Sequence, residues 1–399
     1  MTKRYIRTFF AIVVVSLVGA ALINLVVDPW RVTPEPLSSD AFEPYRDLDS
    51  QIRTGKCGFI RSAPSIGVAL IGSSRVTNSL DPRNPNWGRE DVYNLGGNAS
   101  YIYENEAIFR YLLQKQSPEL VIIGIDPGDL SSTFDTRIIF DFNGSPLGPD
   151  QDRIDREIRY LVGISTLEAS FETIKRRLTD EVPQYDDRGL RRHRPKRQID
   201  QRAFLAAAII GESQFEAPQS AGEDTPIRPD KLKRLGGIVE TCLQRGIRLV
   251  LLIHPQHALS HTRSGEEAML PFERERRDIT YLVDRLNQEK PDAVPAEVWD
   301  FGDYHPINCE PLPTEKGGRM QNWDDFNHYT LEVGDLMLAR IMGWPIEMEG
   351  GEDYGLQLDP ANFDAWLEHA KAGNRRYIEG VGKADIEWAQ GLSNKEGSE

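Results

Sequence analysis

Two serines follow an apolar run at Gly72 in the stretch "VALIGSSRVTNSLDP", residues 68–82, and the second of them is Ser74. Far along the chain, Asp325 stands three residues before His328. A serine hydroxyl is a weak nucleophile until a base takes its proton, and histidine serves as that base when a carboxylate holds its ring in the right tautomer. These residue types predict acyl transfer through a covalent serine intermediate. The alternative is that Ser74 only forms a turn and that His328 only packs or caps a helix.

The elements that would position these residues are five apolar runs of strand length, which alternate with helical patterns. Runs buried on both faces are typical of a parallel sheet covered by helices. We therefore predict an α/β fold, a three-layer α/β/α sandwich with a mostly parallel five-stranded sheet. The expected strands lie at 66–72, 91–97, 119–126, 247–254 and 296–302, and the expected helices lie at 104–116, around 232–243, and from His328 to a stop at Gly343.

Polar residues gather at the carboxyl ends of these strands, where ligands bind in doubly wound sheets. Three histidines, His254, His257 and His261, have a spacing that could hold zinc, but no glutamate stands at the spacing of a metalloprotease helix. We therefore expect no metal and no cofactor, and we expect one of these histidines to line the cleft. The polar clusters are "GSSR" at 72–75, "NLGGN" at 94–98, "GID" at 124–126 and "HPQH" at 254–257.

The order of these clusters resembles that of the SGNH (GDSL-type) hydrolases. "GSSR" resembles the first block of that family, with Ser74 at the nucleophile position, and "DFNH" is similar to its fifth block, with Asp325 and His328. "NLGG" resembles the second block, whose glycine offers a backbone N–H to the oxyanion. The resemblance implies that Ser74 is acylated, that His328 moves the proton and that Asp325 orients His328. It also implies that the N–H groups of Ser74 and of Gly96 or Gly97 stabilise the oxyanion.

The third block departs from the family pattern. The family has an asparagine that donates to the oxyanion in a Gly-x-Asn setting, whereas this chain has Asp126 after Gly124. An ionised carboxylate would repel an oxyanion, so Asp126 needs a nearby cation, and Arg75 is the natural partner. We therefore expect an Arg75–Asp126 ion pair beneath the site and Asn98 as the substitute donor.

Membrane-anchored relatives that modify cell-envelope glycans are similar in having a Gly-Ser-Ser first block and a relaxed third block. This branch includes the families for O-acetylation of exopolysaccharide or alginate. The resemblance implies an extracytoplasmic serine esterase or O-acyltransferase acting on acyl groups, acetyl foremost, of an envelope carbohydrate, with a membrane-bound acyl donor as a further partner. The alternative is an inactive SGNH-shaped binding or assembly component of a polysaccharide system, because fold alone does not settle function.

The N-terminus carries an uncharged apolar stretch at residues 9–27, preceded by three basic residues. As a helix, this stretch is about 28 Å long, close to the thickness of a bilayer core. The basic residues on its N-terminal side predict that the N-terminus is cytoplasmic and that the body lies outside, in the periplasm. We expect an uncleaved single-pass anchor in the cytoplasmic membrane. A cleavable signal peptide, cut near the small residues 19–21, is the alternative.

The amino-acid composition bears on which binding partners and which disulfide bonds to expect. The formal net charge of −15 argues against nucleic-acid binding. Three cysteines are too few for a disulfide scaffold, although Cys57 and Cys309 could pair in an oxidising compartment. The basic run at 191–197 predicts a solvated face. We divide the chain into a cytoplasmic stub and transmembrane anchor at 1–30, a linker at 31–65, an SGNH-like domain at 66–345 with an insertion at about 130–230, and a C-terminal helical extension at 346–399.

Overall fold

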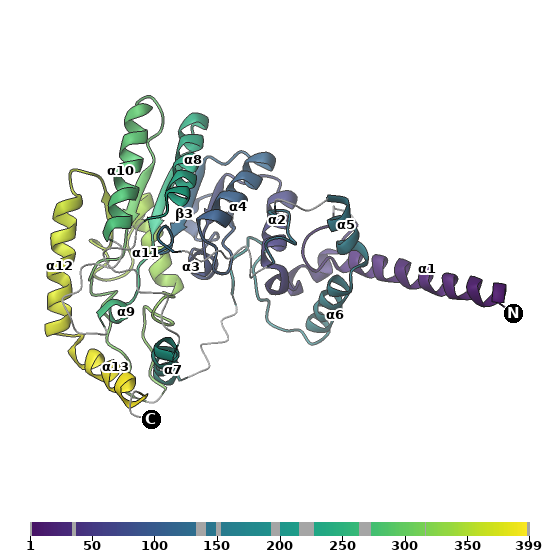
Figure 1. The fold of residues 1–399 in the computed structure, drawn as a ribbon. Coiled ribbons are helices and arrows are strands. Elements are labelled where there is room, and N and C mark those ends of the chain that lie inside the picture. Colours follow the sequence, from purple (N-terminus) through teal and green to yellow (C-terminus); the bar gives the residue numbers. More distant parts are fainter. Residues whose placement is uncertain are drawn as a thin grey trace.

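A six-stranded sheet forms the centre of the computed structural model, which describes residues 2–33, 37–132, 141–148, 153–192, 200–214, 227–262, 273–315 and 317–396. The strand order is β2-β1-β3-β4-β5-β6, and every neighbouring pair is parallel except β5 and β6. The predicted α/β class and the mostly parallel sheet are confirmed (Figure 1). The strands are β1 (Val68–Ile71), β2 (Val92–Asn94), β3 (Leu120–Ile125), β4 (Arg248–Ile253), β5 (Glu297–Asp300) and β6 (Leu356–Leu358).

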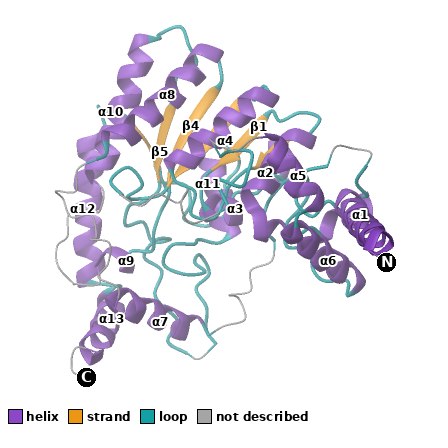
Figure 2. Cartoon of the chain, turned by 45° about the vertical axis from the view of Figure 1, so that its right-hand side comes forward, coloured by secondary structure: helices purple, strands orange, loops and turns teal. Residues whose placement is uncertain are grey.

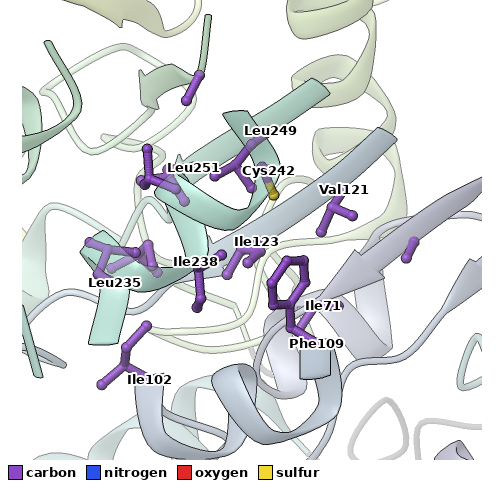
Figure 3. Packing of buried hydrophobic residues seen from close by; sticks show 14 of the residues in the cluster. Ile71, Ile102, Phe109, Val121, Ile123, Leu235, Ile238, Cys242, Leu249 and Leu251 are labelled. Carbon is purple, nitrogen blue, oxygen red and sulfur yellow. The ribbon is translucent and has the colours of Figure 1, made fainter. Parts of the chain in front are cut away.

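Strand side chains alternate between two apolar clusters, because successive side chains point to opposite faces of a strand. In β1, Ala69 and Ile71 belong to one cluster, and Val68 and Leu70 belong to the other. Figure 3 shows part of the first cluster, where residues of the central strands pack with residues of two neighbouring helices. The first cluster includes α2 (Ile52–Ser62), α4 (Ile102–Lys115), α8 (Pro229–Arg245), α10 (Glu273–Glu289) and α12 (Phe363–Glu379).

The second cluster holds the helices that adjoin the candidate site. Figure 2 shows α3 and α11 close together beside the sheet. The insertion between β3 and β4 contributes one helix to this cluster, and the C-terminal region contributes another. The helices are α3 (Ser74–Ser79), α7 (Gln201–Gln214), α9 (Leu259–Thr262), α11 (Leu331–Met342) and α13 (Lys383–Glu396).

The long N-terminal helix, α1 (Thr2–Val27), projects from the body with its first residues farthest away (Figure 1). Among the described residues it is the one helix long and apolar enough to cross a membrane. Its C-terminal turns pack against α5 (Arg153–Val162) and α6 (Ile164–Leu178), which belong to the insertion.

Two segments differ from the sequence-based expectation. The sheet has six strands rather than five, because β6 pairs antiparallel with β5 from within the region expected to be a helical extension. The region 31–65, expected to be a linker, instead contains 3₁₀ turns at Asp40–Tyr45 and Leu48–Gln51 followed by α2, and Phe59 and Ile60 are buried in the core. A third 3₁₀ turn spans Pro85–Trp87.

The three cysteines are buried free thiols, so no Cys57–Cys309 disulfide is present. Most of the basic run at 191–197 lies outside the described residues. The two residues of it that are described are Arg191, which pairs with Asp49, and Arg192.

Candidate active site

The turn after β1 presents two serines at the start of α3. Gly72 has a φ of +154°, a conformation that side-chain-bearing residues rarely adopt, and an added Cβ there would lie 2.5 Å from Val76. Ser73 is the N-cap of α3, with its hydroxyl accepting the backbone N–H of Arg75. Ser73 is thus buried and committed to the turn, whereas Ser74 is half-buried at the first helical position.

A relay of hydrogen bonds links Ser74 to His328 and, through His328, to Asp325. The hydroxyl oxygen of Ser74 lies 2.8 Å from Nε2 of His328. On the other side of the ring, Nδ1 of His328 lies 2.9 Å from each carboxylate oxygen of Asp325. The three predicted catalytic residues are therefore brought together in the order that a serine nucleophile, a general base and an orienting carboxylate require.

The relay depends on a tight loop from residue 323 to residue 329. Asp325 Oδ1 accepts the backbone N–H groups of Asn327 and His328, each at 2.8 Å. A single bridge between Trp323 and Tyr329 closes the loop. The sequence placed His328 at the start of a helix, but α11 begins at Leu331, so His328 stands in the loop before it. Its ring orientation therefore comes from Asp325 and the loop rather than from helical geometry.

The expected ion pair between Arg75 and Asp126 is present. Nη1 of Arg75 donates to Oδ1 of Asp126 at 2.5 Å, and both side chains are mostly buried, at 8% and 13% exposed. Ser73 donates its hydroxyl to the same carboxylate oxygen at 3.0 Å. Burial alone would raise the pKa of Asp126, but the charge of Arg75, assisted by the hydroxyl of Ser73, holds that pKa below its ordinary value. Asp126 is therefore an ionised carboxylate locked in an ion pair.

Arg75 also holds the loop that carries His328, which the sequence did not indicate. Its Nε donates to the carbonyl oxygen of Asn327 at 2.7 Å, and its Nη2 donates to the side-chain oxygen of Asn327 at 3.2 Å. Gln256, in the loop that follows β4, donates to the same side-chain oxygen at 2.8 Å. Arg75 thus positions the loop while it neutralises Asp126.

The glycine N–H groups expected to bind the oxyanion are already used inside the protein. Gly97 donates its N–H to the carbonyl of Gly72 at 2.8 Å, and Gly96 donates its N–H to the side chain of Asn94 at 3.1 Å. The prediction of Gly96 or Gly97 as donors is therefore wrong for this conformation. Gly96 is required for another reason, since an added Cβ would lie 2.7 Å from Thr77 Oγ1 on α3.

Two further donors were expected, the N–H of Ser74 and the side chain of Asn98. The backbone N–H of Ser74 has no hydrogen-bond partner within the described part of the chain, and it belongs to the first residue of α3. Asn98 is half-buried in a loop where Ala99 has an unusual positive φ of 48°. Arg53 holds this loop by donating to the carbonyl of Asn98 at 2.9 Å. The N–H of Ser74 therefore fits an oxyanion role, whereas the role of Asn98 stays a prediction.

A second histidine lies beside the relay. His254, which follows β4, is fully buried, and its Nδ1 lies 3.0 Å from the hydroxyl of Tyr329. Burial lowers the pKa of His254 to about 3, against the opposing field of Asp126, so the ring is neutral at ordinary pH. The expectation that a histidine of this run lines the cleft stays a prediction, because His254 and His257 are fully buried and the side chain of His261 lies outside the described residues.

Other polar groups support the loop rather than the chemistry. Gln201 on α7 donates to the carbonyls of Trp323 and Asp324, at 2.7 and 3.0 Å, which ties the insertion to the relay loop. Nε2 of His257 lies 2.7 Å from the carbonyl of Glu310. Over the described residues, no group of three histidine, cysteine or acidic side chains could hold a metal ion. The side chain of His261 lies outside the described residues.

No protein-family model, no curated protein and no solved structure matches this chain.

Proposed function

We propose that the protein is a serine esterase or O-acyltransferase of the SGNH type, built as a three-layer α/β/α sandwich. The observation that carries the proposal is the relay from Ser74 through His328 to Asp325, which joins residues about 250 positions apart in the sequence. The substrate class is an O-acylated envelope carbohydrate, with acetyl as the acyl group. This class rests on the Gly-Ser-Ser first block and on the N-terminal apolar helix.

The reaction follows from the positions of the three groups. The hydroxyl oxygen of Ser74 attacks the acyl carbonyl carbon while Nε2 of His328 takes its proton, and Asp325 stabilises the imidazolium that forms. The N–H of Ser74 and the side chain of Asn98 donate hydrogen bonds to the oxyanion. The intermediate then collapses, and His328 returns the proton to the leaving hydroxyl. Water or an acceptor hydroxyl, deprotonated by His328, cleaves the acyl-serine in turn.

A polar cavity beside α3 gives the carbohydrate a place to bind. Its volume is about 320 Å³, and Asn78, one helical turn beyond Ser74, lines it together with Asp81, Arg83 and Glu332. Amide, carboxylate and guanidinium groups suit the hydroxyl groups of a sugar. The cavity thus fits the polar part of the proposed substrate.

The proposed location is the outer face of the cytoplasmic membrane, with α1 as the anchor. Basic residues precede the apolar stretch of α1, which favours a cytoplasmic N-terminus and a periplasmic body. Asn24, in the last turns of α1, donates to the carbonyl of Leu161 and accepts from Ser170, at 2.9 and 2.8 Å. These bonds join the last turns of α1 to the folded body.

A fluorophosphonate probe tests the proposal, because it reacts with activated serines. The full-length protein should be labelled, Ser74→Ala should abolish the labelling, and Ser73→Ala should retain it. Equal labelling of all three proteins, or of none, would contradict a nucleophilic Ser74.

One observation favours a second candidate function. The N–H groups of Gly96 and Gly97 are engaged within the protein, and Asp126 stands where the family has an asparagine donor. Weak oxyanion stabilisation would suit an SGNH-shaped protein that binds acylated polysaccharide without cleaving it. This candidate predicts carbohydrate binding that persists in Ser74→Ala, with no acylation of the native protein.

A further inference from the structure

Helix α6 is amphipathic in the opposite sense to a helix of a water-soluble protein. Three large apolar residues lie on its outer side, Ile164, Phe171 and Leu178, and their side chains are 76%, 54% and 81% exposed. They are seven residues apart and therefore share one face of the helix. The buried face holds small or hydroxyl-bearing residues instead, namely Thr166, Ala169, Ser170 and Thr173. In water, the ordinary arrangement buries the large apolar face.

The buried face of α6 packs against the end of α1 (Figure 1). Ser170 donates its hydroxyl to the side chain of Asn24, and that side chain also donates to the carbonyl at the end of α5. Small residues and polar bridges between helices, with large apolar residues turned outward, are the pattern of helix packing within a membrane. The contact of α6 with α1 shares this pattern, although Ala169 of α6 also packs with Trp30, Val32 and Tyr160 in a small apolar cluster.

The part of α1 that α5 and α6 cover also indicates that these two helices lie at the membrane. Residues 3–18 of α1 are almost all exposed, whereas from residue 19 onward most are half-buried or buried. If residues 9–27 span the bilayer core, then the covered part makes up about the last 13 Å of the span. The helices that cover it, α5 and α6, must then lie at the depth of the outer leaflet and its headgroups. Ile158, on α5, is also exposed there.

The charged residues of α5 and α6 are also suited to the depth of the phospholipid headgroups. Between residues 153 and 178 there are six basic and four acidic side chains, in a chain whose formal net charge is −15. Three of the basic residues close α6 in succession, Lys175, Arg176 and Arg177. Long basic side chains beside an apolar face favour the phospholipid headgroup region.

We propose that the α5–α6 pair is an interfacial membrane collar, in which the face of Ile164, Phe171 and Leu178 contacts the acyl chains of the bilayer that α1 crosses. The collar rests on the proposed anchoring by α1 and is independent of the serine chemistry. It holds the body at a fixed height on the membrane, because α5 and α6 are joined to α1 through Asn24.

Lipid-borne fluorescence quenching tests the collar in the full-length protein, reconstituted in phospholipid nanodiscs. The native thiols are buried, so a thiol-reactive fluorophore can report on Phe171→Cys and Ile164→Cys in the collar. Ile12→Cys reports on the middle of α1, where the side chain is 61% exposed. Val294→Cys, between α10 and β5, is the matched body control, with a side chain that is 44% exposed. The quencher is a phospholipid brominated on its acyl chains.

The collar predicts that the fluorescence of both α6 labels falls as at residue 12, while the label at residue 294 is unaffected. Quenching at residue 12 without quenching on α6 would overturn the collar and leave the anchor. α6 labels that are shielded from an aqueous quencher but untouched by brominated lipid would indicate a protein partner and would also overturn it. No quenching at residue 12 would refute both the anchor and the collar. The proposed serine chemistry is tested separately, by fluorophosphonate labelling of Ser74.

Discussion

Nε of Arg75 donates a hydrogen bond of 2.7 Å to the carbonyl oxygen of Asn327, so the residue directly after Ser74 holds the loop that carries His328. The same guanidinium neutralises Asp126, and Asp126 in turn accepts the hydroxyl of Ser73. One cation thus links the turn after β1, the end of β3 and the relay loop. The SGNH pattern has an asparagine at the position of Asp126. In this chain Arg75 neutralises the carboxylate at that position and also holds the loop of the proposed site in place.

Removing Arg75 should cost both stability and activity. Arg75→Ala leaves Asp126 as a buried charge without its partner and frees the loop at Asn327. We expect the free energy of unfolding to fall by about 3–5 kcal/mol, the usual cost of breaking a buried pair, as measured by urea denaturation. Arg285→Ala, which breaks an exposed pair with Glu289, is the control and should cost less than about 1 kcal/mol. Equal losses for the two variants would contradict a buried, organising role for Arg75.

The pair should also give stability a defined pH dependence. Because the pKa of Asp126 is held below its ordinary value, the pair contributes fully above about pH 4 and loses its contribution as the pH falls through the folded-state pKa. The stability difference between the native protein and Asp126→Asn should therefore be constant from about pH 5 upward and shrink below about pH 4. Urea denaturation across this range measures it, and a difference that grows on acidification would be inconsistent with the assignment.

His254 should also lower the stability of the native protein on acidification, but from a higher pH than Asp126. Its pKa is lowered to about 3 by burial, so between about pH 6 and pH 4 the unfolded chain binds a proton that the folded protein does not. The native stability should fall on acidification by about 1.4 kcal/mol per pH unit more steeply than that of His254→Gln. Tyr329→Phe removes the hydroxyl near Nδ1 but leaves the ring buried, so it should keep the native slope. Parallel curves for the native protein and His254→Gln would show that His254 titrates normally.

The two neighbouring aspartates of the relay loop should differ sharply. Asp325→Asn should reduce turnover by about four orders of magnitude with little loss of fold, because the histidine loses the acceptor that fixes its tautomer. Asp324 donates its backbone N–H to the carbonyl of His328 at 2.8 Å, and its carboxylate lies 4.0 Å from Arg319, so Asp324→Asn should have a mild effect. Steady-state kinetics on an acetyl ester compares the two variants. A severe loss in Asp324→Asn alone would mean that the carboxylate has been assigned one residue too late.

The sheet and the relay could be predicted because both leave local marks in the sequence. Continuous apolar runs identify β1 to β5, and the residue types of Ser74, Asp325 and His328 limit their chemistry. The strand β6 had no such mark, since Leu356 and Gln357 are exposed and only Leu358 is buried. This strand forms because it can pair with the edge of β5. That pairing depends on the tertiary structure rather than on the local sequence.

The oxyanion donors could not be predicted for a similar reason. The N–H of Gly97 is used because the pairing of β1 and β2 continues past the end of β2, to Leu95 and Gly97. Whether a backbone N–H is free depends on the register of its neighbour, which residue types do not reveal. The bonds from Arg75 to Asn327 and from Gln201 to the relay loop are likewise set by distant segments.

The most direct test of a nucleophilic Ser74 is the site of acylation. The full-length protein is mixed with p-nitrophenyl acetate, the release of nitrophenol is followed from the first milliseconds, and the acid-quenched protein is mapped by mass spectrometry. We predict a burst of about one nitrophenol per chain, with one acetyl group on Ser74, and the loss of both in Ser74→Ala. No burst and no acetylated serine, or acetylation that persists in Ser74→Ala, would contradict the proposed enzyme.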